Sequence, residues 1–368
     1  DAESTVSPAG RAESLQPPAA TLTARVPRMC KPARGPFAYG EPWWLDDPIE
    51  MSADRFRGRR RQLCFLLGVA ASCAGVVAYT SHAGVLVWSI TPATFGQSSF
   101  VLLPALVVYR IACAAFIFGL CASKLVSDYV LQRGAGAAGA RLNHFETLDR
   151  TEVAFLDHGV WRFQGLTSWG WVLLGCYFLV AATLSLRVAA APEAAQHEEP
   201  DGAACVASLL LGVSSAYAIL ITLTVTFVLI PSKHRKGLST EGFFTPFALS
   251  QHNANLAMVV GELLCGAVPI DPWHLPFALG FGIVYLCGWH QTVRYNRTRT
   301  LMYHFLNWQH PRSLLICSLL MLTLAAFFAF AALVGQLRLR PGGAPMVLCA
   351  ALAVMRWRRP PPLAGKGE

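Results

Sequence analysis

Thr167 and His252 are the two residues of this chain whose types and surroundings are best suited to chemistry. Thr167 lies at the start of one apolar stretch, and His252 lies roughly seven residues, or about 10 Å, inside another. A hydroxyl beside an imidazole, in an apolar pocket closed to bulk water, is the minimum apparatus of a nucleophile activated by a general base. The alternative is structural: Thr167 would bond to its own helix backbone, and His252 would make a helix–helix contact, as polar residues in bundles often do.

The apolar stretch that contains His252 also carries a row of other polar side chains. At 100° per residue, Gln251, Asn255 and Glu262 fall within about 40° of one another, with His252 on the flank. An ionisable group inside a membrane span is costly and marks a functional site by default. We therefore expect this face to point into the protein and to contact a substrate, with Gln251 or Asn255 donating to an oxyanion.

The elements that must position these residues are membrane spans. Of the 368 residues, 54% are hydrophobic and 14% are charged, whereas soluble domains carry about 25% charged residues. This composition indicates an integral membrane protein and excludes intrinsic disorder as the main state. Apolar stretches of the length that crosses a bilayer lie at 62–81, 166–187, 204–230, 245–269, 274–291 and 313–335.

A further apolar region, 84–127, must hold at least one more span. Arg110 and Lys124 bracket only about 13 apolar residues within it. We therefore expect Arg110 to lie at the end of this span, with its side chain snorkelling to the interface rather than binding an anion. The segment 345–355 is short for a crossing and is left open. The sequence predicts an all-α, polytopic transmembrane helix bundle of about seven spans, within a range of six to eight.

Four regions follow from this pattern. Residues 1–61 form a polar tail with a basic end, which we expect to be disordered, and residues 62–83 form an extra N-terminal transmembrane helix. Residues 84–335 form the transmembrane core, and residues 336–368 form a basic, proline-rich C-terminal tail that includes the open segment. Because the chain crosses the membrane out and back between Thr167 and His252, both residues enter from the same side and can meet.

The distribution of charge gives the orientation. The chain has 30 basic and 21 acidic residues, a net charge of +9. Basic residues gather at 55–61, 233–236 and 294–299, and acidic residues gather at 188–203. The positive-inside rule assigns the basic loops to the cytoplasm. The excess charge is therefore topological, and we expect no nucleic-acid partner. The endoplasmic reticulum or another endomembrane and the plasma membrane remain equally open.

No pattern of metal ligands is present in the sequence. The eleven cysteines form no CxxC pair, and the histidines form no HxxxH cluster. We expect the cysteines to pack as small apolar side chains, and we expect no metal and no cofactor. Four further histidines should occupy solvated or interfacial positions at helix ends or in loops: His274, His290, His304 and His310.

Several short motifs resemble those of a known family of multi-pass membrane proteins. The text WRFQGLTSW at 161–169 resembles the WRFF-x-LTxW signature of the rolling-stone proteins and the W-[RK]-[FY]-LTF element of the androgen-induced and androgen-dependent membrane proteins. The text QHNAN at 251–255, with Glu262 ten residues after His252, is similar to a histidine-to-glutamate spacing of that superfamily. Elements at 284–290 and 303–311 resemble further motifs of that superfamily. The resemblance thus covers about residues 105–335 and implies a six-helix core.

The resemblance implies two different functions. Members of the androgen-induced branch are threonine hydrolases that cleave fatty acid esters of hydroxy fatty acids. By motif, Thr167 would be the nucleophile and His252 the catalytic histidine, with membrane lipids as partners and a lipid ester as substrate. The Ser168-Trp169 text is closer to rolling stone, which implies instead a non-enzymatic protein of cell adhesion, fusion or signalling. A transporter built around Glu262 is less favoured, because no inverted repeat is visible. Nothing in the sequence specifies an oligomeric state.

Overall fold

The computed structural model describes most of the chain after residue 54. The described residues are 55–82, 90–98, 100–134, 142–147, 152–156, 163–193, 199–235, 240–295, 300–303, 306–338 and 340–357. All of them belong to one structural unit, Glu41–Glu368, and Asp1–Gly40 form another. The predicted disorder of residues 1–61 thus falls outside the described residues, except at 55–61, which are helical.

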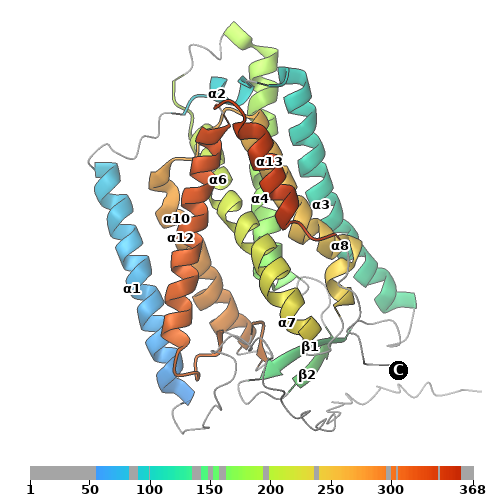
Figure 1. Cartoon of the computed structure of the whole chain (residues 1–368), viewed down its shortest axis with the longest axis vertical. Coiled ribbons are helices and arrows are strands. Elements are labelled where there is room, and N and C mark those ends of the chain that lie inside the picture. The colour runs from blue at the N-terminus through green and yellow to red at the C-terminus, as the bar shows by residue number, and fades with distance from the viewer. Residues whose placement is uncertain are drawn as a thin grey trace, which may run out of the picture. The chain divides into compact units, whose positions relative to one another are not determined.

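Helices dominate the described residues, and short strands form one small sheet (Figure 1). Three of the segments, η3, η5 and η7, are π-helical, and η4 and η6 are 3-10 helices. The elements in chain order are α1 (Arg55–His82), α2 (Ala93–Gly96), α3 (Leu103–Gly134), β1 (Leu142–Thr147), β2 (Glu152–Leu156), α4 (Leu166–Ala190), α6 (Gly202–Leu223), η3 (Thr224–Leu229), α7 (Ile230–Arg235), η4 (Glu241–Phe244), α8 (Pro246–Leu249), η5 (Ser250–Ala254), α9 (Asn255–Cys265), η6 (Pro272–His274), α10 (Leu275–Ile283), η7 (Val284–Arg294), β3 (Thr300–Leu301), α12 (Ser313–Leu337) and α13 (Gly343–Val354).

Five helical stretches in the described part of the chain are long and apolar enough to cross a membrane. They are Gly58–His82, Leu103–Leu125, Leu166–Ala190, Gly202–Arg235 and Ser313–Leu337. The predicted bundle of apolar helices is therefore confirmed. Two further helical stretches, 246–265 and 275–294, match predicted spans. In the first, η5 separates α8 from α9, and in the second, η7 continues α10. The count of seven spans stays a prediction.

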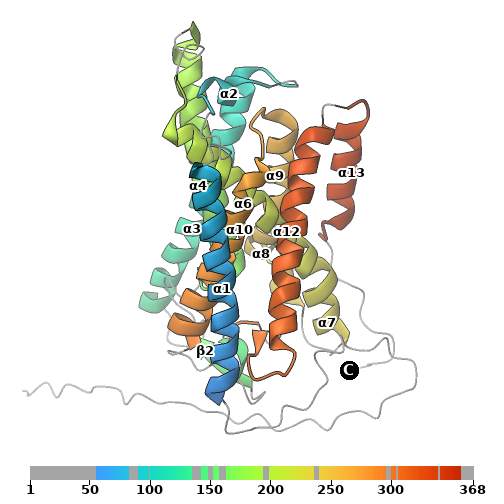
Figure 2. The same ribbon diagram turned by 90° about the vertical axis from the view of Figure 1, so that its left-hand side faces the viewer.

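The segment 345–355, for which a membrane crossing was left undecided, lies in α13. This helix is apolar but only 12 residues long. At 1.5 Å per residue it extends about 18 Å, well short of the roughly 30 Å of hydrocarbon that a span must cross. The helix packs beside α9 and α12 (Figure 2). By its length it is therefore too short to span a membrane alone.

Side-chain caps begin two of the helices, α6 and α8. Asp201 begins α6 by accepting a hydrogen bond from Ala203 N at 2.7 Å. Thr245 begins α8 by accepting one from Ala248 N at 3.2 Å, and Pro246 takes the first helical position. These residues satisfy backbone donors that a helix start leaves unpaired.

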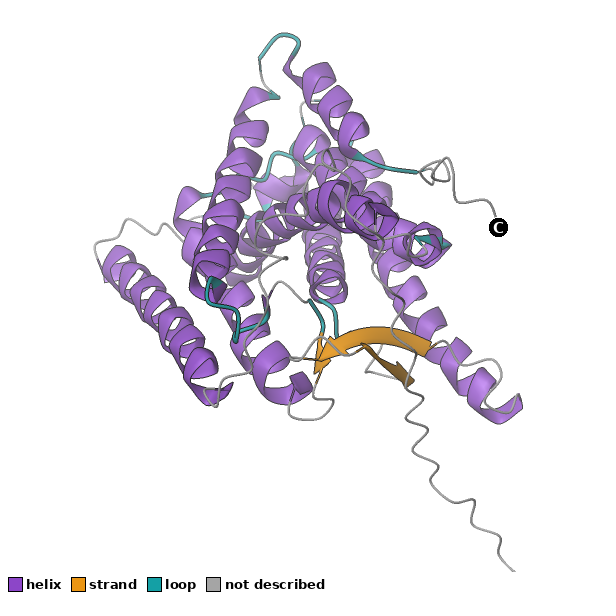
Figure 3. Ribbon diagram, turned by 60° about the horizontal axis from the view of Figure 1, so that its bottom comes forward, coloured by secondary structure: helices purple, strands orange, loops and turns teal. Residues whose placement is uncertain are grey.

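The strands lie at one end of the described helices (Figure 3). β1 pairs antiparallel with β2 and with β3, in the order β2-β1-β3, and the pair Glu146↔Leu301 joins two connections far apart in the sequence. The sequence did not predict this sheet, because β3 has only two residues and carries no periodic signal. Its importance is positional, since the residues that follow β3 are brought against the start of α4.

The extra N-terminal helix docks on the core through polar groups. α1 packs against α10 and α12, and Gln62 contacts the side chain of Gln291 while donating to Cys317 Sγ at 2.8 Å. One turn earlier, Arg59 donates to the Gln291 carbonyl at 2.5 Å and lies 5.7 Å from the Trp308 ring centroid. These contacts explain why the helix begins at Arg55, before the predicted boundary at 61/62.

Close approach of α3 and α4 depends on a glycine. A Cβ at Gly175 would lie 2.7 Å from Ile117 Cγ2 and 3.0 Å from Phe118 Cζ, both on α3. Small residues at such crossings let transmembrane helices pack by van der Waals contact. By contrast, a Cβ at Gly119 on α3 would have nothing within 4 Å.

We expect Gly175→Ala to destabilise the protein by about 1–3 kcal/mol, because the added methyl group overpacks the α3–α4 contact. Gly119→Ala is the matched control and should be neutral or slightly stabilising, since alanine is the better helix former. Thermal unfolding of both purified variants in detergent measures the difference. Equal midpoints for the two variants would contradict the close approach of these helices.

Candidate functional site

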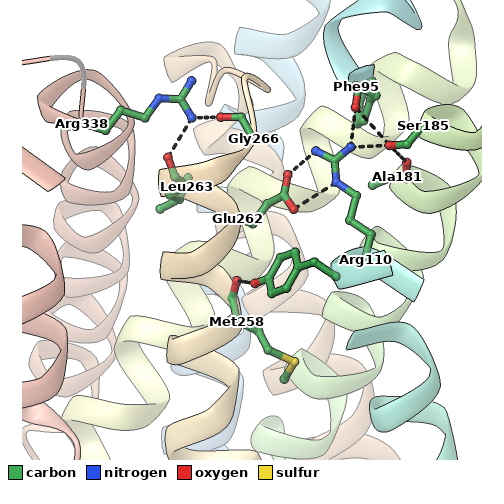
Figure 4. Close-up of polar contacts among 10 residues, drawn as sticks. Phe95, Arg110, Ala181, Ser185, Met258, Glu262, Leu263, Gly266 and Arg338 are labelled. Atoms are coloured by element: carbon green, nitrogen blue, oxygen red, sulfur yellow. Dashed lines mark hydrogen bonds and ion pairs between the residues drawn. The ribbon is translucent and has the colours of Figure 1, made fainter. Parts of the chain in front are cut away.

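A buried ion pair joins α3 to α9 (Figure 4). Arg110 Nε donates to Glu262 Oε2 at 3.1 Å, Nη2 contacts Oε1, and both side chains are fully buried. The remaining Nη1 group donates to the Phe95 carbonyl at 2.6 Å and to Ser185 Oγ at 2.5 Å. One guanidinium thus links α3, α4, α9 and the α2 segment.

The expectation that Arg110 snorkels to the interface is wrong. The helix begins at Leu103, so Arg110 lies at the start of its third turn rather than at its end, and its exposed fraction is 0%. A lone charge there would be very costly, but Glu262 supplies the counter-charge and the neighbouring oxygens accept the other hydrogens. The carboxylate that we expected to contact a substrate is therefore bonded to Arg110.

The end of α9 is shaped around this pair. A Cβ at Gly266 would lie 2.3 Å from Glu262 Oε1, so only glycine leaves room for the carboxylate. Arg338, which follows α12, donates to the Leu263 carbonyl at 2.8 Å and also to the Gly266 carbonyl (Figure 4). A cation at a helix C-terminus satisfies the last carbonyls and interacts favourably with the helix dipole.

Thr167 and His252 lie away from the ion pair, on neighbouring elements. Ser185, which contacts Arg110, is 18 residues after Thr167 on α4, which corresponds to about 27 Å along the helix. At the Thr167 end, Gln251 Nε2 donates to Ser168 Oγ at 3.3 Å, and both groups are buried. Thr167 and His252 are each one residue from this contact, so the structure brings their elements together.

Three π-helical segments adjoin this region. η3 follows α6, η5 joins α8 to α9, and η7 follows α10. Within η5 the His252 carbonyl accepts a hydrogen bond from Thr222 Oγ1 at 2.5 Å, and the same hydroxyl lies 3.3 Å from Asn255 Oδ1. π-helical turns are rare and frequently occur at functional sites. The predicted site therefore coincides with the least regular backbone of the membrane helices.

A tyrosine contacts the start of α4. Leu166 N, one residue before Thr167, donates to Tyr303 OH at 3.3 Å. Thr167 itself is half-buried. The predicted alternative, in which Thr167 bonds to its own helix backbone, stays a prediction.

The His252 side chain lies near Phe243 of η4. Its ring centroid is 6.0 Å from that of Phe243, and its buried Nδ1 has no hydrogen-bond partner among the described residues. In that part of the chain no hydrogen bond joins Thr167 to His252. This nitrogen of the imidazole is thus without a partner in the described part of the chain, one residue from the contact that joins α4 to η5.

The predicted substrate contacts are engaged within the protein. Gln251 binds Ser168, and Asn255 Oδ1 accepts from Leu256 N at 2.6 Å as well as lying near Thr222. The role of these amides as oxyanion donors stays a prediction.

The expectation of solvated positions is wrong for three of the other histidines. His274, His290 and His310 are all buried. His290 Nε2 accepts from Met302 N at 3.2 Å, and His310 Nδ1 accepts from Arg312 N at 3.1 Å. These rings satisfy backbone donors in turns, which sequence spacing does not reveal. His304 lies outside the described residues.

Sequence reasoning overlooked the hydroxyl residues that complete both polar centres. Ser185, Thr222 and Tyr303 each bond to a residue of another element, namely Arg110, His252 and Leu166 respectively. A polar group buried in an apolar helix must find a hydrogen-bond partner, so the presence of these hydroxyl residues in apolar stretches was an available signal. The identity of each partner depends on the packing of distant segments. For Arg110 and Glu262, the presence of opposite charges in two spans was the available signal.

No protein-family model, no curated protein sequence and no solved structure matches this chain. The resemblance to the rolling-stone and androgen-induced proteins therefore rests on the short motifs alone.

We expect Arg110→Met to destabilise the protein by about 3–5 kcal/mol, because it leaves the Glu262 carboxylate buried without a counter-charge. The double variant Arg110→Met/Glu262→Leu should recover most of this loss, since no charge then remains in the apolar interior. Thermal unfolding in detergent measures each variant.

Arg187→Met is the matched control for this prediction. Arg187 forms an ion pair with Asp201 at 2.7 Å, but its side chain is half exposed. Removing such a pair costs about 0–1 kcal/mol. A double variant as unstable as Arg110→Met would contradict the importance of charge compensation.

Proposed function

We propose that this chain is a multi-pass membrane protein of the rolling-stone and androgen-induced kind, and that it hydrolyses lipid esters with Thr167 as nucleophile. The observation that carries the proposal is the Gln251–Ser168 hydrogen bond at 3.3 Å. It holds the start of α4 against η5, with Thr167 and His252 each adjacent in sequence to a bonded residue. The membrane class has further support from the five apolar helices.

Two properties of the residues suit them to this role. The Thr167 side chain is half-buried at a helix start, where backbone N–H groups favour a developing negative charge on the hydroxyl oxygen. His252 has a buried Nδ1 with no donor among the described residues, so this nitrogen is free to accept a proton. Catalytic hydrogen bonds are often long before substrate binds, so the lack of a Thr167–His252 bond among the described residues does not conflict with this role.

The reaction would proceed through an acyl-threonine. His252 takes the proton from Thr167 Oγ1, Oγ1 bonds to the ester carbonyl carbon, and the electron pair moves to the carbonyl oxygen. Collapse of this intermediate expels the alcohol half of the ester, which receives the proton from His252. Water, deprotonated in turn by His252, then releases the acid and restores the threonine. The family resemblance favours fatty acid esters of hydroxy fatty acids as the substrates.

A second candidate is a non-enzymatic protein of adhesion, fusion or signalling. The observation that favours it is that the polar side chains of Gln251 and Glu262 are bonded to other elements of the protein, which gives them a structural explanation. A transporter centred on Glu262 has less support, since its carboxylate is neutralised by Arg110.

We expect a fluorophosphonate probe to label the full-length protein in membranes, and Thr167→Ala to abolish the labelling, because the substitution removes the nucleophilic oxygen. His252→Ala should slow labelling by about 100-fold or more, which is the usual contribution of a general base. Gel fluorescence of the labelled band measures both effects.

The matched control is Thr183→Ala. Thr183 lies on the same helix, is exposed, and bonds to the Leu179 carbonyl one turn away at 2.9 Å. Its substitution should leave labelling unchanged. Wild-type protein that takes no label, or Thr167→Ala that labels normally, would contradict the hydrolase and leave the non-enzymatic candidate.

A further inference from the structure

The chain that follows α13 is tied to η5 by a buried asparagine. Asn253 Nδ2 donates to the Arg356 carbonyl at 2.9 Å, and Arg356 N donates back to Asn253 Oδ1 at 3.4 Å. One side-chain amide thus pairs with both backbone groups of a residue 103 positions later in the chain. Since Asn253 follows His252 directly in η5, these bonds hold the Arg356 backbone against the element that carries His252.

The depth of Arg356 follows from the lengths of the helices around it. Arg338 binds the last carbonyls of α9, so the end of α12 is level with the end of α9. α13 begins a few residues later and packs beside both helices (Figure 2). Its 12 residues extend about 18 Å back, and Asn253 lies 12 residues, also about 18 Å, before the end of α9 at Cys265. The Arg356 backbone therefore lies inside the apolar stretch, about 10 Å from its start at Pro246.

The Arg356 side chain brings a permanent positive charge to this depth. A guanidinium keeps its charge in proteins, and a charge inside a membrane is costly unless an anion or a water-filled cavity receives it. Arg356 is half-buried, and within the described ranges its guanidinium makes no hydrogen bond, ion pair or ring contact. Glu262 neutralises Arg110 in the same bundle, but no described carboxylate does so for Arg356.

A second cation lies near the same element. The His252 ring centroid is 6.0 Å from that of Phe243, and Lys233 Nζ lies 5.3 Å from the same Phe243 centroid. Lys233 is exposed near the end of α7. Cations from α7 and from the segment after α13 thus both lie in the surroundings of η5, and their combined field attracts an anion to this part of the protein.

An apolar surface leads along α13 to Arg356. Leu348 and Leu352 are four residues apart and therefore share a face of the helix, and they are 47% and 57% exposed. Leu352 is itself four residues before Arg356. Because α13 runs from the level of Arg356 toward the far end of α9, an acyl chain whose head is bound at Arg356 would follow these leucines into the membrane.

We propose that Arg356 binds the carboxylate of a single-chain lipid, a long-chain fatty acid, whose chain lies along Leu352 and Leu348. The planar guanidinium matches a carboxylate with two parallel hydrogen bonds. A carboxylate joined directly to its chain reaches the depth of Arg356, whereas a phospholipid keeps its phosphate at the headgroup level. α13 lies outside the residues that resemble the rolling-stone and androgen-induced proteins. The inference goes beyond the proposed hydrolase and does not depend on it.

The test measures the binding of radiolabelled oleate to the full-length protein in phosphatidylcholine nanodiscs, with the signal of empty nanodiscs subtracted. We expect saturable binding to wild type, and we expect Arg356→Met to weaken it by about 10- to 100-fold, the range for losing hydrogen bonds to a charged group. Arg356→Lys should retain part of the affinity, because it keeps the charge but loses the planar fork. Methyl oleate, which has the same chain and no charge, should compete at least about 10-fold less well than oleate.

Arg340→Met is the matched control. Arg340 is exposed in the turn before α13, at the opposite end of that helix, so its substitution should leave oleate binding at the wild-type value. Both methionine variants should unfold at the wild-type midpoint without oleate, which separates lost binding from misfolding.

Four results would each overturn the inference. They are the absence of saturable binding to wild type, equal binding by Arg356→Met, equal competition by methyl oleate, and competition by acetate or phosphatidate that matches or exceeds that of oleate. Competition by acetate would indicate a site for any small anion, and competition by phosphatidate would indicate a site for a phospholipid headgroup. None of these results bears on the hydrolase, which the labelling of Thr167 tests separately.

Discussion

The need to pair charges in an apolar interior governs the arrangement of these helices. Arg110 and Glu262 are both fully buried, and neither could remain charged there without the other. Their bond fixes α3 against α9, and the remaining guanidinium hydrogens reach α4 and the α2 segment. Gly266 then follows as a necessity, since any side chain at that position would meet the carboxylate.

In the region around Thr167 and His252, neutral hydrogen bonds rather than ion pairs satisfy the buried polar groups. Here the backbone departs from the α-helical pattern in η3, η5 and η7, and carbonyls that lose regular partners must find others. Thr222 serves the His252 carbonyl, and the Gln164 carbonyl accepts from both Tyr285 and Trp289. Neutral hydrogen bonds are individually weaker than a buried ion pair, so this region can rearrange around a ligand more readily than the Arg110 centre.

The spans could be predicted from sequence because apolar length is a local property, and the predicted stretch 166–187 corresponds to α4 at Leu166–Ala190. Hydrogen-bond and ion-pair partners could not be predicted, because the partners of Arg110 and Gln251 come from distant segments. The helical-wheel argument for Gln251, Asn255 and Glu262 assumed 100° per residue throughout. η5 breaks that assumption, since a π turn contains more residues than an α turn. The shared face was thus only partly predictable: all three residues are buried, but they bind three different elements.

The buried Nδ1 of His252 has no hydrogen-bond partner among the described residues. An unsatisfied buried polar group costs about 1–3 kcal/mol in a protein interior. His290 Nδ1 and Trp171 Nε1 are buried without partners there as well, so this property by itself does not set His252 apart as a base. What distinguishes His252 is its place beside Gln251, whose hydrogen bond to Ser168 joins η5 to the start of α4.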